Sequence, residues 1–345
     1  MLNRCFVFFK NFCFLLIQSK SQLFSLLSLF KSLAVYDLKS ASSVLYFSLE
    51  SLTSVYRYKK LGKTTTKLIE SKKLTKEKHN SLFILGSGPS VNELSKEEWN
   101  YIRENDSWGF NQWFCNDFVP SGYIAQSLIE PKNDKLQSRS YRHNKMVSKM
   151  LLDKKEYYTD IDFFIRGDAV NRQKFYQTEL GINIESVTNG QCSLLAELPV
   201  SSSNKIPPDI LLNILYEKGF YKIKDEIQPI PKIGSTITEL ISFALMLGYK
   251  EIVLCGIDMN DGGHFYDNED YFQRYPMLRE LSRFNHTRTV GGGHEHMDTS
   301  TRPFTIKEYI MALKSLAKSK FNADIYVIRE TSTLYPDLPK YKYHE

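Results

Sequence analysis

The sequence predicts an α/β fold: a Rossmann-like, mostly parallel sheet with helices on both faces, a small lid subdomain and an N-terminal helical extension. From residue 81 onward, short apolar runs alternate with amphipathic stretches. Glycine and proline follow the ends of those runs, as they do at loops. Because 42% of the 345 residues are hydrophobic and 13% are aromatic, the chain can bury a sizeable core.

The first 80 residues differ from the rest in charge. They carry a net charge of +10, whereas residues 81–345 carry −4. Lys10, Lys20 and Lys31 interrupt Phe- and Leu-rich stretches, so no run reaches the ~20 apolar residues of a spanning helix. Amphipathic helices followed by a basic run over residues 57–78 indicate association with an anionic membrane surface. The alternative is a helical hairpin packed on the main domain and followed by a solvated linker.

Composition narrows the class of protein further. The mildly acidic main domain excludes a general nucleic-acid-binding protein, which would spread positive charge over its folded surface. Five scattered cysteines without a C-x-x-C motif indicate reduced thiols in a cytosolic environment. We therefore expect a cytoplasmic protein, peripheral on the inner face of the cell membrane. Its oligomeric state, homo-oligomer included, stays open.

The expected elements begin with a strand at 81–85 and a glycine- and proline-containing loop at 86–90. Ser95 and Glu98 form a capping box that opens a helix toward Ile102. Strands follow near 108–110, 123–128 and 161–165. Residues 182–233 show no clear pattern, and four prolines mark loops there: Pro207, Pro208, Pro229 and Pro231.

The clearest unit lies toward the C-terminus. Thr236-x-x-Glu239 caps a helix that Gly248 ends, and a buried strand follows at 251–255. The expected inner side of that helix consists of Ile237, Leu240, Ile241, Ala244 and Leu245. A helix at 305–318 and a last strand at 324–328 complete the pattern. We expect a catalytic domain over 81–345, with its lid around 259–304.

Two segments favour a ligand that bears phosphate. Gly86-Ser-Gly-Pro-Ser90 and the segment from Gly234 to Tyr266 each place small or hydroxylated residues at the start of a helix. Helix N-termini have unpaired N–H groups and attract anions. The first loop lacks the third glycine of a dinucleotide fingerprint and the Gly-Lys-Ser/Thr of a P-loop. Taken alone, it is equally typical of a sharp turn without a ligand.

Five segments together resemble a known family: residues 86–90, 110–112, 235–236, 247–252 and 256–258. Their order and spacing are similar to those of the bacterial lipooligosaccharide sialyltransferases of glycosyltransferase family 42, over about residues 82–330. The resemblance implies an inverting transferase without a metal or other cofactor. Its donor would be a CMP-activated sialic acid or a related acid, another nonulosonate or Kdo. Its acceptor would be a lipooligosaccharide or capsule glycan.

The resemblance also assigns roles to individual residues. Those expected along the CMP phosphate, the ribose and the donor sugar are Gly86, Ser87, Gly88, Asn111, Ser235, Thr236 and Asp258. Tyr266 matches one of two tyrosines that hydrogen-bond the departing phosphate, and Asn260 replaces the other. Ser87 stands where the family has Asn, and Ile237 where it has Gly. Glu130 stands at a family Asn that faces the sugar, which leaves the sugar and a retaining mechanism open.

The family takes its general base from a lid histidine. His294 and His296 follow three glycines at about that place, with His294 slightly preferred. Together with Asp298 they could instead bind a metal, or they could form a surface pair without a role. His264 and Tyr266 could likewise be ordinary turn residues.

Two other functions remain open at this point. A pterin-type pyrophosphokinase would use a Gly-x-Gly-Pro-Ser-like loop with ATP, and would hold Mg²⁺ on carboxylates such as Asp258, Asp261 and Asp267. A catalytically inactive scaffold at the membrane surface would need no donor at all.

Overall fold

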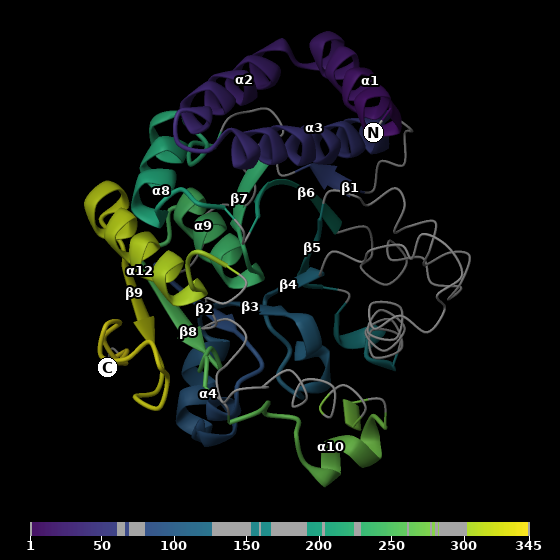
Figure 1. Ribbon diagram of the computed structural model, residues 1–345. Coiled ribbons are helices and arrows are strands. Elements are labelled where there is room, and N and C mark those ends of the chain that lie inside the picture. The colour runs from purple at the N-terminus through teal and green to yellow at the C-terminus, as the bar shows by residue number, and fades with distance from the viewer. Residues whose placement is uncertain are drawn as a thin grey trace.

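The chain forms a nine-stranded sheet in which every strand pairing among the described residues is parallel (Figure 1). This computed structural model describes residues 2–60, 66–68, 80–125, 153–158, 160–166, 192–201, 204–223, 229–260, 262–276, 278–279, 282 and 302–343. The strand order is β1-β6-β5-β4-β3-β2-β8-β9, and β7 pairs with β6. The strands are β1 Thr66–Leu68, β2 Ser81–Leu85, β3 Asp106–Phe110, β4 Gly122–Ala125, β5 Asp162–Arg166, β6 Cys192–Val200, β7 Pro229–Ile233, β8 Glu251–Cys255 and β9 Asp324–Val327. The expected parallel α/β fold is confirmed.

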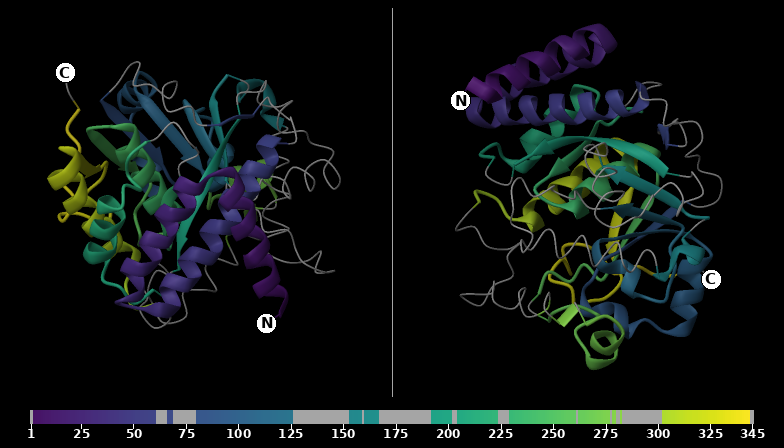
Figure 2. Two further views of the ribbon diagram at one scale, coloured as in Figure 1. Left: turned by 90° about the horizontal axis from the view of Figure 1, so that it is seen from above. Right: turned by 90° about the vertical axis from the view of Figure 1, so that its right-hand side faces the viewer.

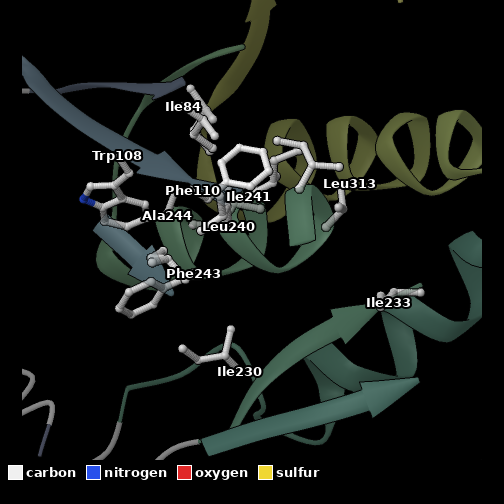
Figure 3. Packing of buried hydrophobic residues seen from close by; sticks show 14 of the residues in the cluster. Ile84, Trp108, Phe110, Ile230, Ile233, Leu240, Ile241, Phe243, Ala244 and Leu313 are labelled. Carbon is white, nitrogen blue, oxygen red and sulfur yellow. The ribbon is translucent and has the colours of Figure 1, made fainter. Parts of the chain in front are cut away.

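Helices cover both faces of the sheet. The helices of the described residues are α1 Leu2–Gln18, α2 Lys20–Ala34, α3 Leu38–Lys60, α4 Lys96–Arg103, α8 Pro208–Glu217, α9 Thr236–Leu247, α10 Glu269–Arg274 and α12 Ile306–Leu316. The central strand β2 is buried throughout. Its Phe83 makes an edge-to-face contact with Tyr101 of α4, and Ile84 lies among the residues around α9 (Figure 3). Since neighbouring side chains of a strand point to opposite faces, α4 and α9 cover opposite faces of β2.

Several local predictions are confirmed at their residues. Ser95 accepts a hydrogen bond from the N–H of Glu98, whose carboxylate accepts one from the N–H of Ser95, and α4 follows. The helix expected at 305–318 is α12; it begins with a second capping box, formed by Thr305 and Glu308, which was not predicted from the sequence. Gly248 ends α9 with φ +90°, a conformation that favours glycine.

Three predictions are wrong in detail. The N-cap of α9 is Ser235, whose hydroxyl accepts from the N–H of Thr238, so Thr236 is the first helical residue. The glycine loop leads into a short 3-10 turn, η1 Pro89–Glu93, rather than an α-helix. Pro229 and Pro231 lie in strand β7, not in a loop. Strand β7 pairs with β6 alone among the described residues, and such an end strand tolerates residues that lack an N–H.

Helix α9 is buried on all sides, beyond the single inner side that its pattern predicts. Phe243 stacks on Trp108 of β3 and meets Phe164 of β5 edge to face. Figure 3 shows Ile230 and Ile233 of β7 on the other side of the helix. The sheet curls, so that α9 lies between β7 and the strands β2 and β3.

The N-terminal residues form three helices, as the amphipathic pattern predicts (Figure 2). Helix α3 packs on β6, and Ser51 accepts a hydrogen bond of 2.8 Å from the N–H of Glu197. Leu49, Leu52 and Val55 of α3 are fully buried. Residues 66–68 add β1 to the sheet within the basic run, for which the sequence left open a membrane-associating segment or, as the alternative, a solvated linker. Among the described residues, no helix combines the length and hydropathy needed to cross a bilayer.

Candidate functional site

The candidate site lies where the chain order of the sheet reverses. From β2 the chain proceeds outward through β3, β4, β5 and β6, and it returns to the other side of β2 with β8. In parallel α/β sheets, ligands bind at such a switch point, beyond the carboxyl ends of the strands. Residues 86–90 follow β2, Asn111 follows β3, and residues 256–266 follow β8. The fold therefore brings three of the predicted segments to adjacent strand ends.

Two glycines allow the loops after β2 and β8 to cross at close range. The N–H of Gly86 donates to the carbonyl of Cys255, and the N–H of Gly88 donates to the carbonyl of Gly256, both at 2.7 Å. A Cβ at Gly86 would lie 2.6 Å from the Gly256 oxygen, and one at Gly256 would lie 2.7 Å from the Gly86 oxygen. Gly256 also has φ +64°. Side chains at these positions would force the loops apart.

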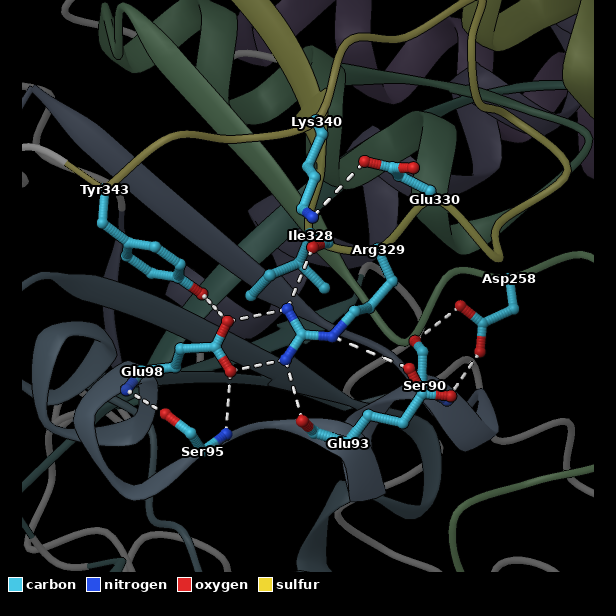
Figure 4. Close-up of polar contacts among 10 residues, drawn as sticks. All are labelled: Ser90, Glu93, Ser95, Glu98, Asp258, Ile328, Arg329, Glu330, Lys340 and Tyr343. Carbon is cyan, nitrogen blue, oxygen red and sulfur yellow. Dashed lines mark hydrogen bonds and ion pairs between the residues drawn. The ribbon is translucent and has the colours of Figure 1, made fainter.

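Asp258 links the two loops through Ser90 (Figure 4). Its carboxylate accepts from the N–H of Ser90 at 2.9 Å and from the hydroxyl at 2.6 Å, and the residue is 4% exposed. An N–H at the start of η1, where the sequence suggested a phosphate, is thus already paired with a carboxylate. Asp258 fixes the shape of the glycine loop, and its predicted contact with a ribose remains a prediction.

An ion pair between Arg329 and Glu98 connects α4 with the 3-10 turn η1 that follows the glycine loop. Arg329 forms a bidentate pair with Glu98 of α4 and also donates to the carbonyl of Glu93 in η1 (Figure 4). Tyr343 donates to the same Glu98 carboxylate at 3.0 Å. Burial is the largest single influence and would raise the pKa of Glu98. The hydrogen bonds from Arg329, from the N–H of Ser95 and from Tyr343, together with the positive charge of Arg329, outweigh it, so this pKa lies below its usual value.

The turn at 264–268 closes over the glycine loop. The N–H of Phe265 donates to the carbonyl of Ser87 at 2.9 Å, and the hydroxyl of Ser87 lies 3.2 Å from Nδ1 of His264. The His264 ring stacks on Tyr266, with centroids 4.8 Å apart. Tyr266 is fully buried. The sequence placed Ser87 and Tyr266 in the site but offered His264 only as a turn residue. Its partner lies 177 positions away along the chain, and no local pattern reveals such a contact.

Asn111 has the most unusual backbone among the predicted residues. Its φ is +54°, and its carbonyl accepts a hydrogen bond from the hydroxyl of Tyr123. Within the described part of the chain, its side-chain oxygen Oδ1 is buried and has no hydrogen-bond partner. A non-glycine residue in this conformation is strained, and such strain concentrates at functional sites. Both features make Asn111 a strong candidate for ligand contact.

Ser235 and Thr236 begin α9 at the end of β7. Because α9 is the crossover that returns the chain to β8, it starts at the edge of the sheet where all the strands end. Both residues therefore lie at the same edge as the glycine loop. The Ser235 hydroxyl is used in capping, at 3.4 Å from the N–H of Thr238.

The remaining predicted residues fall into two groups. Asn260 is tied to its own loop, since it accepts from the N–H of Gly262 at 3.1 Å and donates to the carbonyl of Thr331 at 3.3 Å. Glu130, His294 and His296 lie outside the described residues. The sugar-facing position and the predicted base therefore remain predictions.

The described residues offer little for a metal. No group of three His, Cys, Asp or Glu side chains with the geometry of a metal site occurs among them. Of the three carboxylates considered for Mg²⁺, Asp258 is held by Ser90, and Asp267 accepts from the N–H of His264 at 2.7 Å. Asp261 lies outside the described residues.

No protein-family model and no curated protein sequence matches the chain. Among solved structures, it is similar to an α-2,3-sialyltransferase from Campylobacter jejuni in apo form, with a TM-score of 0.36 and 20% identity over 78% of this chain and 82% of that one. It is also similar to monomeric CstII, with a TM-score of 0.35 and 14% identity over 75% of this chain and 85% of that one. A third similar structure is the sialyltransferase CstII from Campylobacter jejuni in complex with a substrate analogue, CMP-3FNeuAc. Its TM-score is 0.31, with 13% identity over 75% of this chain and 84% of that one.

Proposed function

We propose that the chain is a glycosyltransferase that takes a sialic acid, or a related 2-keto sugar acid, from a CMP-linked donor. The observation that carries the proposal is the crossing of two glycine-containing loops at the switch point between β2 and β8. The strained Asn111, with its unpartnered buried oxygen, lies at the next strand end. This arrangement suits a nucleotide that lies across the crossed loops, at the switch point of the sheet.

Transfer of a sugar from CMP requires few functions of the protein. CMP is a good leaving group, so the site has to position the donor and the acceptor, stabilise charge on the phosphate and accept one proton. Tyr266 and the hydroxyl groups at the start of α9 would donate hydrogen bonds to the phosphate. His264, stacked on Tyr266 and next to Ser87, would add an imidazole donor on the side of the glycine loop. His294 or His296 would accept the proton from the acceptor hydroxyl.

The acceptor in this proposal is a glycan of a lipooligosaccharide or capsule precursor held at the membrane. An enzyme with such an acceptor gains from working at the inner face of the cell membrane. The positive charge of residues 1–80 supports that location.

The proposal is tested by incubating the purified protein separately with CMP-Neu5Ac and CMP-Kdo and measuring the release of CMP. We expect slow release from one donor through hydrolysis, and faster release when an acceptor glycan is added. Release from neither donor, combined with Mg²⁺-dependent consumption of ATP and a pterin substrate, would show a pyrophosphokinase. Failure to bind CMP in calorimetry would favour the inactive scaffold.

A further inference from the structure

Exposed apolar side chains concentrate on the N-terminal helices. Among the described residues, nine of the eleven large hydrophobic side chains that are exposed lie between positions 6 and 47. They are Phe6, Phe9, Leu16, Ile17, Phe24, Val35, Tyr36, Leu38 and Phe47. Isolated exposed hydrophobic residues are normal, but a concentration on one segment indicates a surface that something covers.

In α1 and α2, three of them share a helical face with exposed lysines. In α1, Phe6, Lys10 and Ile17 follow one another at intervals of four and seven residues, and all three are exposed. In α2, the exposed residues Lys20, Phe24 and Lys31 repeat the same intervals. Residues so spaced share one helical face. These six residues are called the outer N-terminal face below.

The opposite side of α2 is apolar as well and faces the protein. Its Leu23, Leu26, Leu29 and Leu33 are at most 2% exposed. Helix α2 packs against α3, which in turn packs on β6, so α1 and α2 form the outermost layer (Figures 1 and 2). A surface helix on a soluble domain normally turns a polar face to water. Phe24 of α2, which is 62% exposed, instead presents an apolar side chain to water, and so do Phe6 and Ile17 of α1.

The charge of the N-terminal helices indicates which kind of partner would cover their exposed face. Residues 2–34 contain four basic residues and no acidic one. A second copy of the chain would bring like charges together at this face, which disfavours pairing. Anionic headgroups complement the lysines, whose aliphatic stems lie along apolar surface while their ammonium groups reach the phosphates. Helices that carry apolar and basic residues on one face lie in the plane of a bilayer interface.

We propose that the outer N-terminal face docks on an anionic lipid bilayer, with Phe6, Ile17 and Phe24 inserted at headgroup level and Lys10, Lys20 and Lys31 on lipid phosphates. The inference deepens the proposed function by naming the surface that holds the enzyme beside a lipid-linked acceptor. The inference rests on the proposed function only for the purpose of the membrane contact. Binding to the bilayer itself does not depend on which donor the chain uses.

The test measures how much of the full chain sediments with lipid vesicles at about physiological salt. One set of vesicles is pure phosphatidylcholine, and the other, by choice of the test, contains 30 mol% phosphatidylglycerol. One variant combines Lys10→Gln, Lys20→Gln and Lys31→Gln, and a second combines Phe6→Ser, Ile17→Ser and Phe24→Ser. A matched control changes Lys155→Gln and Tyr157→Ser, since both are exposed on another part of the chain. Thermal unfolding and CMP release without vesicles are measured for every protein.

We expect the wild type and the control to bind the anionic vesicles and to bind pure phosphatidylcholine far more weakly. Each lysine near the surface contributes about fivefold to affinity, so the lysine variant should bind about a hundredfold more weakly. The serine variant should lose binding as well, with unchanged CMP release. Equal binding to both vesicle types, or full binding by either variant, would overturn the inference. So would a wild-type dimer in sedimentation velocity that the serine variant abolishes. Vesicle binding without CMP release would instead refute the proposed function alone.

Discussion

Replacing Gly88 with alanine should destabilise the chain, because the new Cβ would occupy space that Asp258 already fills. The Cβ would lie 2.3 Å from Oδ2 of Asp258 and 2.8 Å from the carbonyl oxygen of Gly256. The carboxylate cannot swing away freely, since both of its oxygens accept hydrogen bonds from Ser90 at 2.9 and 2.6 Å. The substitution therefore forces either the backbone or this hydrogen-bonded pair to move.

The magnitude follows from these two contacts. Overpacking a close site costs about 1–3 kcal/mol, and losing one hydrogen bond to a charged group costs about 1.5–3 kcal/mol. We expect Gly88→Ala to lower the free energy of unfolding by about 2.5–6 kcal/mol in urea titrations. Displacement of Asp258 would also reshape the glycine loop, so CMP affinity measured by calorimetry should fall in the same variant.

Gly219 provides the matched control. Its φ is +80° and a Cβ there would meet nothing within 4 Å, so Gly219→Ala reports left-handed strain alone, about 1–2 kcal/mol. A double-mutant cycle with Asp258→Ala isolates the proposed clash, because Gly88→Ala should cost less once the carboxylate is absent. The reasoning is refuted if Gly88→Ala costs no more than Gly219→Ala, or costs the same with and without Asp258.

Four further outcomes follow from the structure and the proposed chemistry. Tyr266→Phe should reduce CMP release by about 10²–10³-fold in steady-state assays, because one donor to the leaving phosphate is lost. Glu98→Gln should lower the free energy of unfolding by about 1.5–3 kcal/mol through the pair with Arg329. Since the folded pKa of Glu98 is depressed, its stabilisation is present above about pH 4.3 and is lost as the pH falls through the folded value, which urea titrations at several pH values would follow. Burial raises the pKa of the Cys115 and Cys255 thiols far above its usual value, so brief iodoacetamide treatment should leave both unmodified by peptide mass spectrometry until the chain unfolds. EDTA should leave CMP release unchanged.

Each of these has a contrary result. Normal turnover by Tyr266→Phe would remove the tyrosine from the leaving-group site, with the exposed Tyr157→Phe as its control. An acid-unfolding profile unchanged by Glu98→Gln would assign the low-pH loss of stability to other carboxylates. Rapid labelling of Cys255 in the folded chain would mean that the β8 end opens. Inhibition by EDTA that added Mg²⁺ reverses would favour the pyrophosphokinase.

Local chemistry predicted the elements that carry their own signals. The capping box at Ser95 and Glu98 works within three residues, and Gly248 ends α9 through its own backbone freedom. The apolar runs of β2 and β8 are buried because both sit in the middle of a parallel sheet. The three segments at the candidate site were also identified from sequence, since strands and turns place them at strand ends.

What the tertiary structure alone decided are the contacts between distant parts of the chain. Whether Pro229 and Pro231 lie in a loop or a strand depends on β6 having a free side to pair with. The N-terminal residues 66–68 become a strand for the same reason. Ser90 and Asp258 are separated by 168 positions, and their hydrogen bonds place a carboxylate where the sequence suggested a ligand phosphate. The sequence by itself determined local geometry, because caps and turns need only near neighbours. Strand partners and buried charges were decided by the folded chain, because their free energy depends on residues that only folding brings together.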